Sequence, residues 1–161
     1  MRPGSSGAGP SPRLILLLLV LLAFGLRLYH LDYQSLWRDE MDAILFARQE
    51  LGQLLALFVK PGHNGPLYYL ILHGWVRLAG DSEFSVRFPS LVCGVLGVPL
   101  VYLVGRLWLG STASLTAATL ATTSPYLVWY GQEGKMYTLV LLLSLLSTYV
   151  YLMALERNRP V

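Results

Sequence analysis

Long runs of apolar residues, separated by short polar segments, dominate the pattern of this chain. The runs cover residues 14–31, 66–79, 86–107, 111–130 and 136–155. A helix that crosses a membrane needs about 20 predominantly apolar residues, which favours every run except 66–79 as a span. Segment 66–79 is short and contains His73 and Arg77, so it suits a helix that lies at the membrane interface. The pattern predicts an all-α integral membrane protein with about four transmembrane helices.

The segment between the first two runs shows helical periodicity of a different kind. Within residues 41–58, apolar side chains recur at helical spacing and polar ones fill the remaining positions. This predicts an amphipathic helix along the membrane surface, which ends at the Gly/Pro-rich segment 60–66. We therefore expect a long outer loop, residues 32–85, that contains two surface helices, and we find no internal repeat and no strand pattern.

The placement of charge supports four spans. With 66–79 outside the membrane, both termini are cytoplasmic, and the inner side carries five of the twelve basic residues but only Glu156 among the nine acidic ones. If 66–79 also spanned, Arg106, Arg157 and Arg159 would move to the outer side and weaken this bias. Because cytoplasmic loops are enriched in Lys and Arg, the four-span arrangement is preferred. It places the acidic loops that follow the first and third spans on the same, outer face.

The chain ends predict short tails around one membrane module. Residues 1–13 are rich in Gly, Ser and Pro and are typical of a disordered cytoplasmic tail. A basic start before an apolar run also resembles a secretory signal, with 23–25 as a small-x-small cleavage site. We favour an uncleaved anchor because the apolar character continues past Arg27. The expected domains are the tail 1–13, the membrane module 14–155 and a second cytoplasmic tail, 156–161.

Composition agrees with a membrane protein. The chain is 55% apolar and only 13% charged, with a mean hydropathy of +0.54. These values lie outside those of typical soluble domains. A net charge of +3 does not indicate nucleic-acid binding, because the basic residues do not cluster. Cys93 is the single cysteine, so an internal disulfide is excluded and a packing thiol is expected.

Two acidic motifs at the ends of predicted spans are the candidates for chemistry. The first is residues 37–40, Trp-Arg-Asp-Glu, and the second is residues 130–137, which contain Gln132, Glu133 and Lys135. Carboxylates beside a bilayer are costly unless they are paired, solvated or functional. Asp39 could cap the helix that follows it, or one carboxylate of the first motif could act as a general base.

The basic and histidine candidates also carry two interpretations each. Lys60 and His63 could belong to a turn at the interface, or could hold a phosphate or a metal. Glu133 and Lys135 could form a solvated turn. Alternatively, Glu133 could orient an acceptor or a metal while Lys135 neutralises the leaving phosphate. Arg87 could contact a lipid phosphate, but pairing with Glu83 or Asp81 is favoured.

Taken in order, these motifs resemble the N-terminal part of a GT-C superfamily glycosyltransferase. The nearest resemblance is to glycosyltransferase family 39 and the bacterial protein O-mannosyltransferase-like and aminoarabinose-transferase-like enzymes. The resemblance covers residues 27–155 and is carried by segments 35–40, 63–70, 83–90, 105–107 and 124–137. Relatives usually have an arginine where this chain has Lys135.

The resemblance implies an enzyme that transfers a sugar from a polyprenyl-phosphate donor to a lipid, glycan or protein acceptor, with inversion. The active face would point outward, in a bacterial plasma membrane, and membrane lipids but no nucleic acid would be partners. The resemblance assigns catalytic carboxylates to Asp39, Glu40 and Glu133. Candidate substrate-binding residues are Arg38, Lys60, His63, Arg87, Gln132, Lys135 and Tyr137. A divalent metal is compatible with the motifs but not required. Because relatives continue for many more spans, we expect either a fragment or a short paralogue, and the alternative function is a non-catalytic membrane subunit.

Overall fold

A computed structural model describes residues 10–60 and 65–157, and within these residues the chain is all-helical, with eight helices and no strand. The helices are α1 (Pro12–Leu28), α2 (Arg38–Arg48), α3 (Leu51–Leu57), α4 (Pro66–Ala79), α5 (Glu83–Arg106), α6 (Ser111–Thr123), α7 (Pro125–Gly131) and α8 (Tyr137–Arg157). The predicted tails lie largely outside the described residues. Residues 12–13 already belong to α1, and residues 156–157 still belong to α8.

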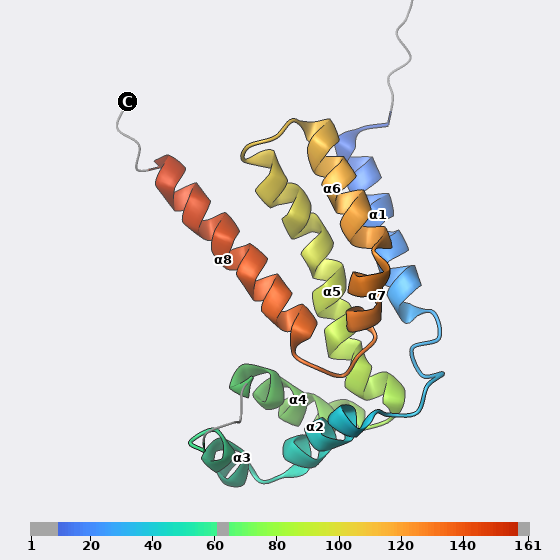
Figure 1. Cartoon of the computed structure of the whole chain (residues 1–161), viewed down its shortest axis with the longest axis vertical. Coiled ribbons are helices and arrows are strands. Elements are labelled where there is room, and N and C mark those ends of the chain that lie inside the picture. The colour runs from blue at the N-terminus through green and yellow to red at the C-terminus, as the bar shows by residue number, and fades with distance from the viewer. Residues whose placement is uncertain (1–9, 61–64, 158–161) are drawn as a thin grey trace, which may run out of the picture.

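The helices form two layers (Figure 1). Helices α1, α5, α6–α7 and α8 run along the long axis as a bundle, and α5 packs against α1, α6, α7 and α8. Helices α2, α3 and α4 lie across one end of this bundle. The layer has its own apolar core, made by residues such as Ile44, Leu54 and Leu72. Helices were expected in this part of the chain, but the sequence predicted two of them and the structure has three.

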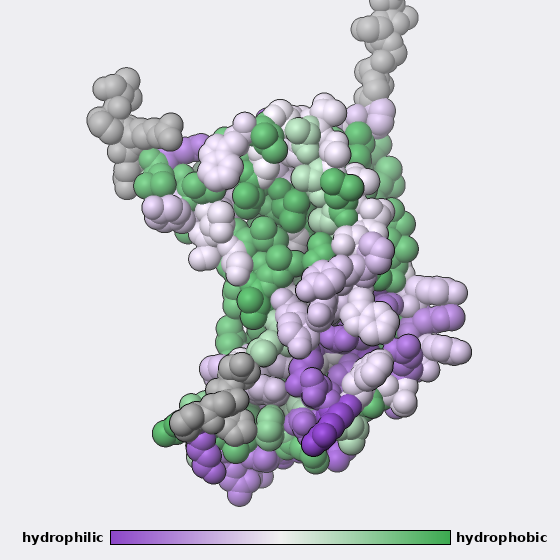
Figure 2. Space-filling view, in the orientation of Figure 1, coloured by the Kyte–Doolittle hydropathy of each residue, from purple (hydrophilic) through white to green (hydrophobic). Residues whose placement is uncertain are grey.

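Two helices of the described residues, α5 and α8, are long and apolar enough to cross a membrane. Their surroundings agree with a lipid environment, because on the face shown in Figure 2 apolar side chains cover much of the bundle while hydrophilic ones gather mainly at the α2–α4 end. Helix α8 is the extreme case, with Thr138 as its one fully buried residue. A long apolar helix that is exposed along most of its length is expected in lipid and not in water.

Helix α1 shows how an apolar run can carry a defined inner face. Ser11 caps its N-terminus by accepting the backbone N–H of Leu14, and Pro12 occupies the first turn, where its missing N–H has no consequence. Its buried residues, Leu19, Ala23 and Arg27, repeat at intervals of four. The helix ends at Leu28, three residues before the predicted end, because His30 adopts a left-handed conformation with φ 57°.

The surface helix predicted over 41–58 is divided into α2 and α3, so this prediction was wrong in its continuity. Gln49 and Glu50 are extended, with ψ of 159° and 144°. The last residues of α2 make contacts with distant parts of the chain. The carbonyl oxygen of Ala47 accepts a hydrogen bond from His73 Nδ1 at 2.9 Å, and Arg48 pairs with Asp81. Helix α4, by contrast, has the predicted bounds of 66–79.

The predicted span 111–130 is also interrupted, between α6 and α7. Pro125 has no N–H to donate to the preceding turn, and residues before proline avoid the helical region. Ser124 accordingly leaves the helical region, with ψ 118°, and its hydroxyl accepts the N–H of Leu127 at 3.4 Å to start α7. The interruption leaves carbonyl groups at the end of α6 without helical donors.

Candidate functional site

The first acidic motif forms the start of α2, with its two carboxylates pointing in different directions. Trp37 is the N-cap, so the prediction that Asp39 occupies this position was wrong. Glu40 supplies the side-chain bond instead, accepting the N–H of Trp37 at 3.0 Å. Since neighbouring helical residues lie about 100° apart around the axis, Asp39 is exposed while Glu40 is buried.

Glu40 is held by four hydrogen bonds in the interior. Arg87 Nε donates to Oε1 at 2.9 Å and Nη2 donates to Oε2 at 2.8 Å, and the N–H of Gly134 reaches Oε1 at 2.7 Å. The N–H of Trp37 is the fourth donor. Burial alone raises the pKa of Glu40, but the bonds from Arg87, Gly134 and Trp37 outweigh it and hold the pKa below its ordinary value. The predicted pairing of Arg87 with Glu83 or Asp81 was wrong, because Glu40 is the partner.

Arg87 also organises the loop between α1 and α2. Its Nη1 donates to the carbonyl oxygens of Leu31 and Gln34 at 2.8 and 2.9 Å, and Nη2 donates to that of Ser35 at 3.3 Å. A planar guanidinium with five donors suits this combination of carboxylate and carbonyl acceptors. One buried cation therefore fixes the loop, the start of α2 and α5 relative to one another.

The second acidic motif joins α7 to α8 and is tied to the same centre. Gly134 binds Glu40, and the carbonyl oxygen of Lys135 accepts the Ser90 hydroxyl at 2.9 Å. Glu133 accepts the indole N–H of Trp129 at 2.7 Å. Its pKa is raised, chiefly by burial, and the nearby carboxylates of Glu40 and Asp39 add to the effect.

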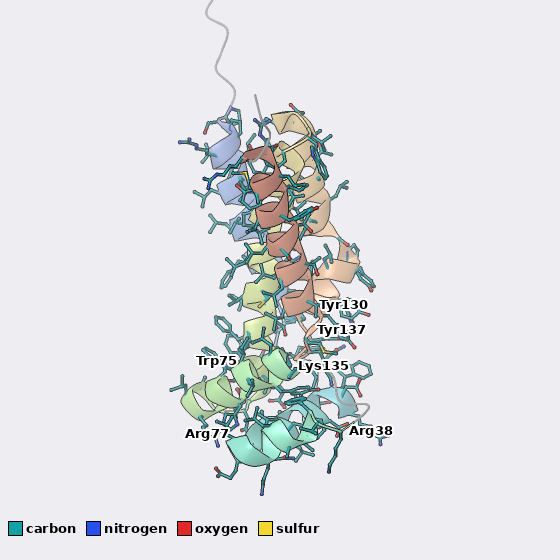
Figure 3. All side chains as sticks on the ribbon, turned by 90° about the vertical axis from the view of Figure 1, so that its left-hand side faces the viewer. Arg38, Trp75, Arg77, Tyr130, Lys135 and Tyr137 are labelled. Carbon is teal, nitrogen blue, oxygen red and sulfur yellow. The ribbon has the colours of Figure 1, made fainter. Side chains whose placement is uncertain are left out.

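A cavity of about 350 Å³ lies between these two motifs, and we call it the carboxylate cavity. It is lined by Trp37, Arg38, Asp39, Glu40, Tyr130, Glu133, Lys135 and Tyr137. Figure 3 shows Tyr130, Tyr137 and Lys135 gathered where the bundle meets the α2–α4 layer, with Arg38 on the α2 side. Six of the residues proposed from the sequence as catalytic or substrate-binding thus meet in one space. They are Arg38, Asp39, Glu40, Glu133, Lys135 and Tyr137.

A second cavity of about 220 Å³ adjoins it, and we call it the aromatic cavity. Its lining consists of His30, Leu31, Tyr33, Gln34, Trp37, Arg87, Trp129, Gln132 and Glu133. Trp37 and Glu133 line both cavities. Two of the proposed substrate-binding residues, Arg87 and Gln132, lie here. Lys60 is exposed after α3 and lines neither cavity, and His63 lies outside the described residues.

A known protein family matches more than half of this chain. A model of the family described as dolichyl-phosphate-mannose-protein mannosyltransferase matches residues 60–161. The chain belongs to this mannosyltransferase family. The matched region contains Arg87, Glu133 and Lys135, whereas Asp39 and Glu40 precede it. No curated protein and no solved structure matches the chain. Family membership and two long apolar helices together indicate a membrane protein.

Arg27 is a residue of this mannosyltransferase-family chain that sequence reasoning missed. It is 1% exposed and donates to the carbonyl oxygens of Ala121 and Thr122, the groups left without helical donors before Pro125. A Cβ at Gly131 would lie 2.9 Å from Arg27 Cδ, so the glycine admits the side chain. An arginine inside an apolar run is costly in a membrane. This cost could have identified Arg27 from the sequence as a residue with buried partners.

The backbone of Arg27 also supports the second acidic motif. Gln132 Nε2 donates to the carbonyl oxygens of Arg27 and Tyr29 at 3.3 and 2.7 Å. These two hydrogen bonds fix Gln132, which immediately precedes Glu133 in the chain. Within the described residues no group of three or more His, Cys, Asp or Glu side chains is arranged to hold a metal ion.

Proposed function

We propose that this protein transfers a sugar from a polyprenyl-phosphate donor to an acceptor hydroxyl, with Asp39 as the general base. The observation that carries this proposal is the carboxylate cavity, which places Asp39 and Glu133 together with Arg38 and Lys135 at one end of an apolar bundle. Carboxylates serve an acceptor hydroxyl and cations serve a phosphate, so the cavity contains both kinds of group that the reaction needs.

The reaction is a single displacement. The acceptor oxygen forms a bond to the anomeric carbon of the donor sugar while the bond from that carbon to the phosphate oxygen breaks. The phosphate leaves with the electron pair as polyprenyl phosphate, and the hydroxyl proton passes to the Asp39 carboxylate. Attack from the side opposite the leaving group inverts the anomeric centre. Arg38 and Lys135 stabilise the negative charge that develops on the phosphate.

Environment separates the roles of the three carboxylates. Asp39 is exposed within the cavity and accepts the proton. Glu40 has its acceptor positions occupied by Arg87 and two backbone N–H groups, so it acts as a positioning residue. Glu133, whose pKa is raised by burial, orients the acceptor hydroxyl.

Phosphate binding is assigned to the cations of the carboxylate cavity. Lys60 is exposed and lines neither cavity, so its role at the phosphate stays a prediction, as does that of His63. The two cations supply the charge compensation that a divalent metal would otherwise supply. We therefore propose that transfer continues when chelator is present.

The proposed topology has four spans, with α1 and the α6–α7 pair in addition to α5 and α8. Helix α1 has 17 residues. At the usual helical rise it is about 26 Å long, slightly less than the roughly 30 Å of hydrocarbon in a bilayer. The four elements run side by side in Figure 1, and the segments that line the carboxylate cavity, residues 37–40 and 130–137, lie at one of their ends. We assign this end to the outer face of a bacterial plasma membrane. We propose that the site is open to lipid at this end, because the donor carries a polyprenyl tail.

The test is transfer of radiolabelled sugar from polyprenyl-phosphate donors in membranes that contain the wild type or Asp39→Asn. We expect the substitution to reduce transfer by at least 100-fold, since general bases typically contribute about 10²–10⁴-fold. Asp42→Asn is the matched control, because Asp42 lies on the exposed side of the same helix and undergoes the same chemical change. Equal transfer by Asp39→Asn and the wild type would contradict the proposal.

A further inference from the structure

The aromatic cavity has the chemistry of a carbohydrate site. Its lining includes the aromatic residues Tyr33, Trp37 and Trp129 and the amide residues Gln34 and Gln132. The C–H faces of a sugar ring pack on aromatic rings, while its hydroxyl groups need donors and acceptors in fixed positions. At about 220 Å³ the cavity suits a single sugar ring better than a lipid tail.

The aromatic cavity adjoins the carboxylate cavity, in which we propose that the reaction takes place. Trp37 and Glu133 form part of its wall and also part of the wall of the carboxylate cavity. A ligand in the aromatic cavity therefore lies next to Glu133, and a hydroxyl group that passes this residue enters the space that contains Asp39. The two cavities are placed as neighbouring binding sites for two substrates of one reaction.

The walls of the aromatic cavity are held in place before any ligand arrives. Arg87 binds the carbonyl oxygens of Leu31, Gln34 and Ser35. His30 has a left-handed backbone that non-glycine residues rarely adopt, and its ring stacks between Tyr29 and Tyr33 at centroid distances of 4.0 and 5.1 Å. Such strained residues persist where the surroundings over-determine them, and they cluster at ligand sites.

A membrane aromatic belt accounts for the exposure of Tyr33, Trp37 and Trp129 but not for their polar neighbours. Belt residues place their rings at the interface with lipid headgroups, as the exposed Trp108 in the connection between α5 and α6 can do. In the aromatic cavity, however, Trp129 donates its indole N–H to Glu133, and its neighbours are the side chains of Gln132 and Arg87. The rings line a polar recess that also contains a carboxylate.

A peptide acceptor suits the cavity less well. Extended peptides bind mainly by pairing with free backbone groups. The carbonyl oxygens of Leu31, Gln34 and Ser35 already accept Arg87, and that of Tyr29 accepts Gln132. The lining also contains the side chains of Gln34 and Gln132, whose amide groups suit the hydroxyl groups of a sugar.

We infer that the aromatic cavity binds a carbohydrate acceptor, with one sugar ring packed against Trp129 and a free hydroxyl directed past Glu133 toward Asp39. This rests on the proposed function, because the hydroxyl is the nucleophile of that reaction. Its oxygen bonds to the donor's anomeric carbon, the phosphate leaves with the electron pair, and the proton goes to Asp39.

The experiment measures binding of methyl hexosides to the full chain in lipid nanodiscs by saturation-transfer NMR, without a donor. We expect saturable binding that weakens at least fivefold in Trp129→Leu. The matched control, Trp108→Leu, makes the same change in the connection between α5 and α6, outside the aromatic cavity, and should bind as the wild type does. His30→Gly is a second variant, since glycine tolerates the left-handed backbone while the ring is lost. It should weaken binding too.

The inference is overturned if no methyl hexoside binds saturably, or if Trp129→Leu and His30→Gly both bind as the wild type does. It is also overturned if a serine-containing peptide binds in a Trp129-dependent way and the hexosides do not. Sugar transfer from the polyprenyl-phosphate donor is measured separately with Asp39→Asn. Hexoside binding that depends on Trp129 without any transfer would contradict the proposed function alone. Asp39-dependent transfer without hexoside binding would contradict the acceptor assignment alone.

Discussion

The buried pair of Glu40 and Arg87 is the most sharply testable part of the structure. Their side chains are 2% and 4% exposed, and Glu40 accepts four hydrogen bonds. Glu40→Gln keeps the volume of the side chain. Its new NH₂ group, however, replaces one of the two carboxylate oxygens, and each of these oxygens accepts hydrogen bonds from two N–H donors. Removing one member of a buried ion pair costs about 3–5 kcal/mol, because the other charge is left uncompensated. We expect a loss of this size in the free energy of unfolding.

Asp39→Asn provides the matched control on the neighbouring residue. It makes the same carboxylate-to-amide change at an exposed position. Substitutions at such positions usually change stability by no more than about 0.5 kcal/mol. Thermal unfolding in detergent, followed by tryptophan fluorescence, measures both variants. For a chain of this size, a loss of about 3–5 kcal/mol lowers Tm by about 6–20 °C. Glu40→Gln should therefore separate clearly from Asp39→Asn.

The double variant Glu40→Gln/Arg87→Met tests whether the cost arises from the pair itself. If it does, the two single losses are not additive, and the double variant is more stable than their sum by about 0.5–3 kcal/mol. The reasoning is refuted if Glu40→Gln and Asp39→Asn unfold at the same temperature. It is also refuted if the single losses add within experimental error.

Four further predictions follow from the contacts around the site. Arg27→Met should cost about 2–4 kcal/mol, since two carbonyl groups lose their donor, and Arg27→Lys should cost less, as measured by thermal unfolding in detergent. Gly131→Ala should cost about 1–3 kcal/mol in the same measurement because its Cβ meets Arg27, whereas Gly52→Ala, with nothing within 4 Å, should not destabilise. Lys135→Met should raise the KM for the polyprenyl-phosphate donor about tenfold or more in the transfer assay, through loss of a charge-assisted bond to phosphate. Because the pKa of Glu133 is raised, the folded state binds the proton of this carboxyl group more tightly than the unfolded state does. The resulting stabilisation is lost as pH rises from the ordinary pKa of 4.5 through the raised pKa. Glu133→Gln should abolish this loss, which is measured by unfolding curves at a series of pH values.

Periodicity and charge predicted the elements well because they report on local structure. The run 66–79 coincides with α4, and its position across the end of the bundle agrees with the interface helix expected from His73 and Arg77. The all-helical class and the convergence of the two acidic motifs were also predictable, since both motifs follow apolar runs that end on the same side. The proximity of Asp39, Glu133 and Lys135 could be predicted from the topology alone.

Interactions between distant residues could not be predicted in the same way. The division of the helix expected over 41–58 depends on His73, which lies 26 residues beyond Ala47. The partner of Arg87 is Glu40, 47 residues earlier, and nothing in the local sequence distinguishes it from the nearer Glu83. Periodicity describes the exposure of a single element, whereas partner choice depends on how the elements pack.

The space around Arg27 has a consequence for how related sequences can vary. Gly94 and Gly131 approach this side chain so closely that a Cβ would lie 3.0 Å from its Nε or 2.9 Å from its Cδ. Homologues that replace Arg27 by a small residue would be released from this requirement, and alanine or serine could then occupy positions 94 and 131. Such homologues should also lack proline at position 125, because an uninterrupted helix needs no external donor for its carbonyl groups. These four positions, scattered over three helices and a helix junction, should therefore change together during evolution.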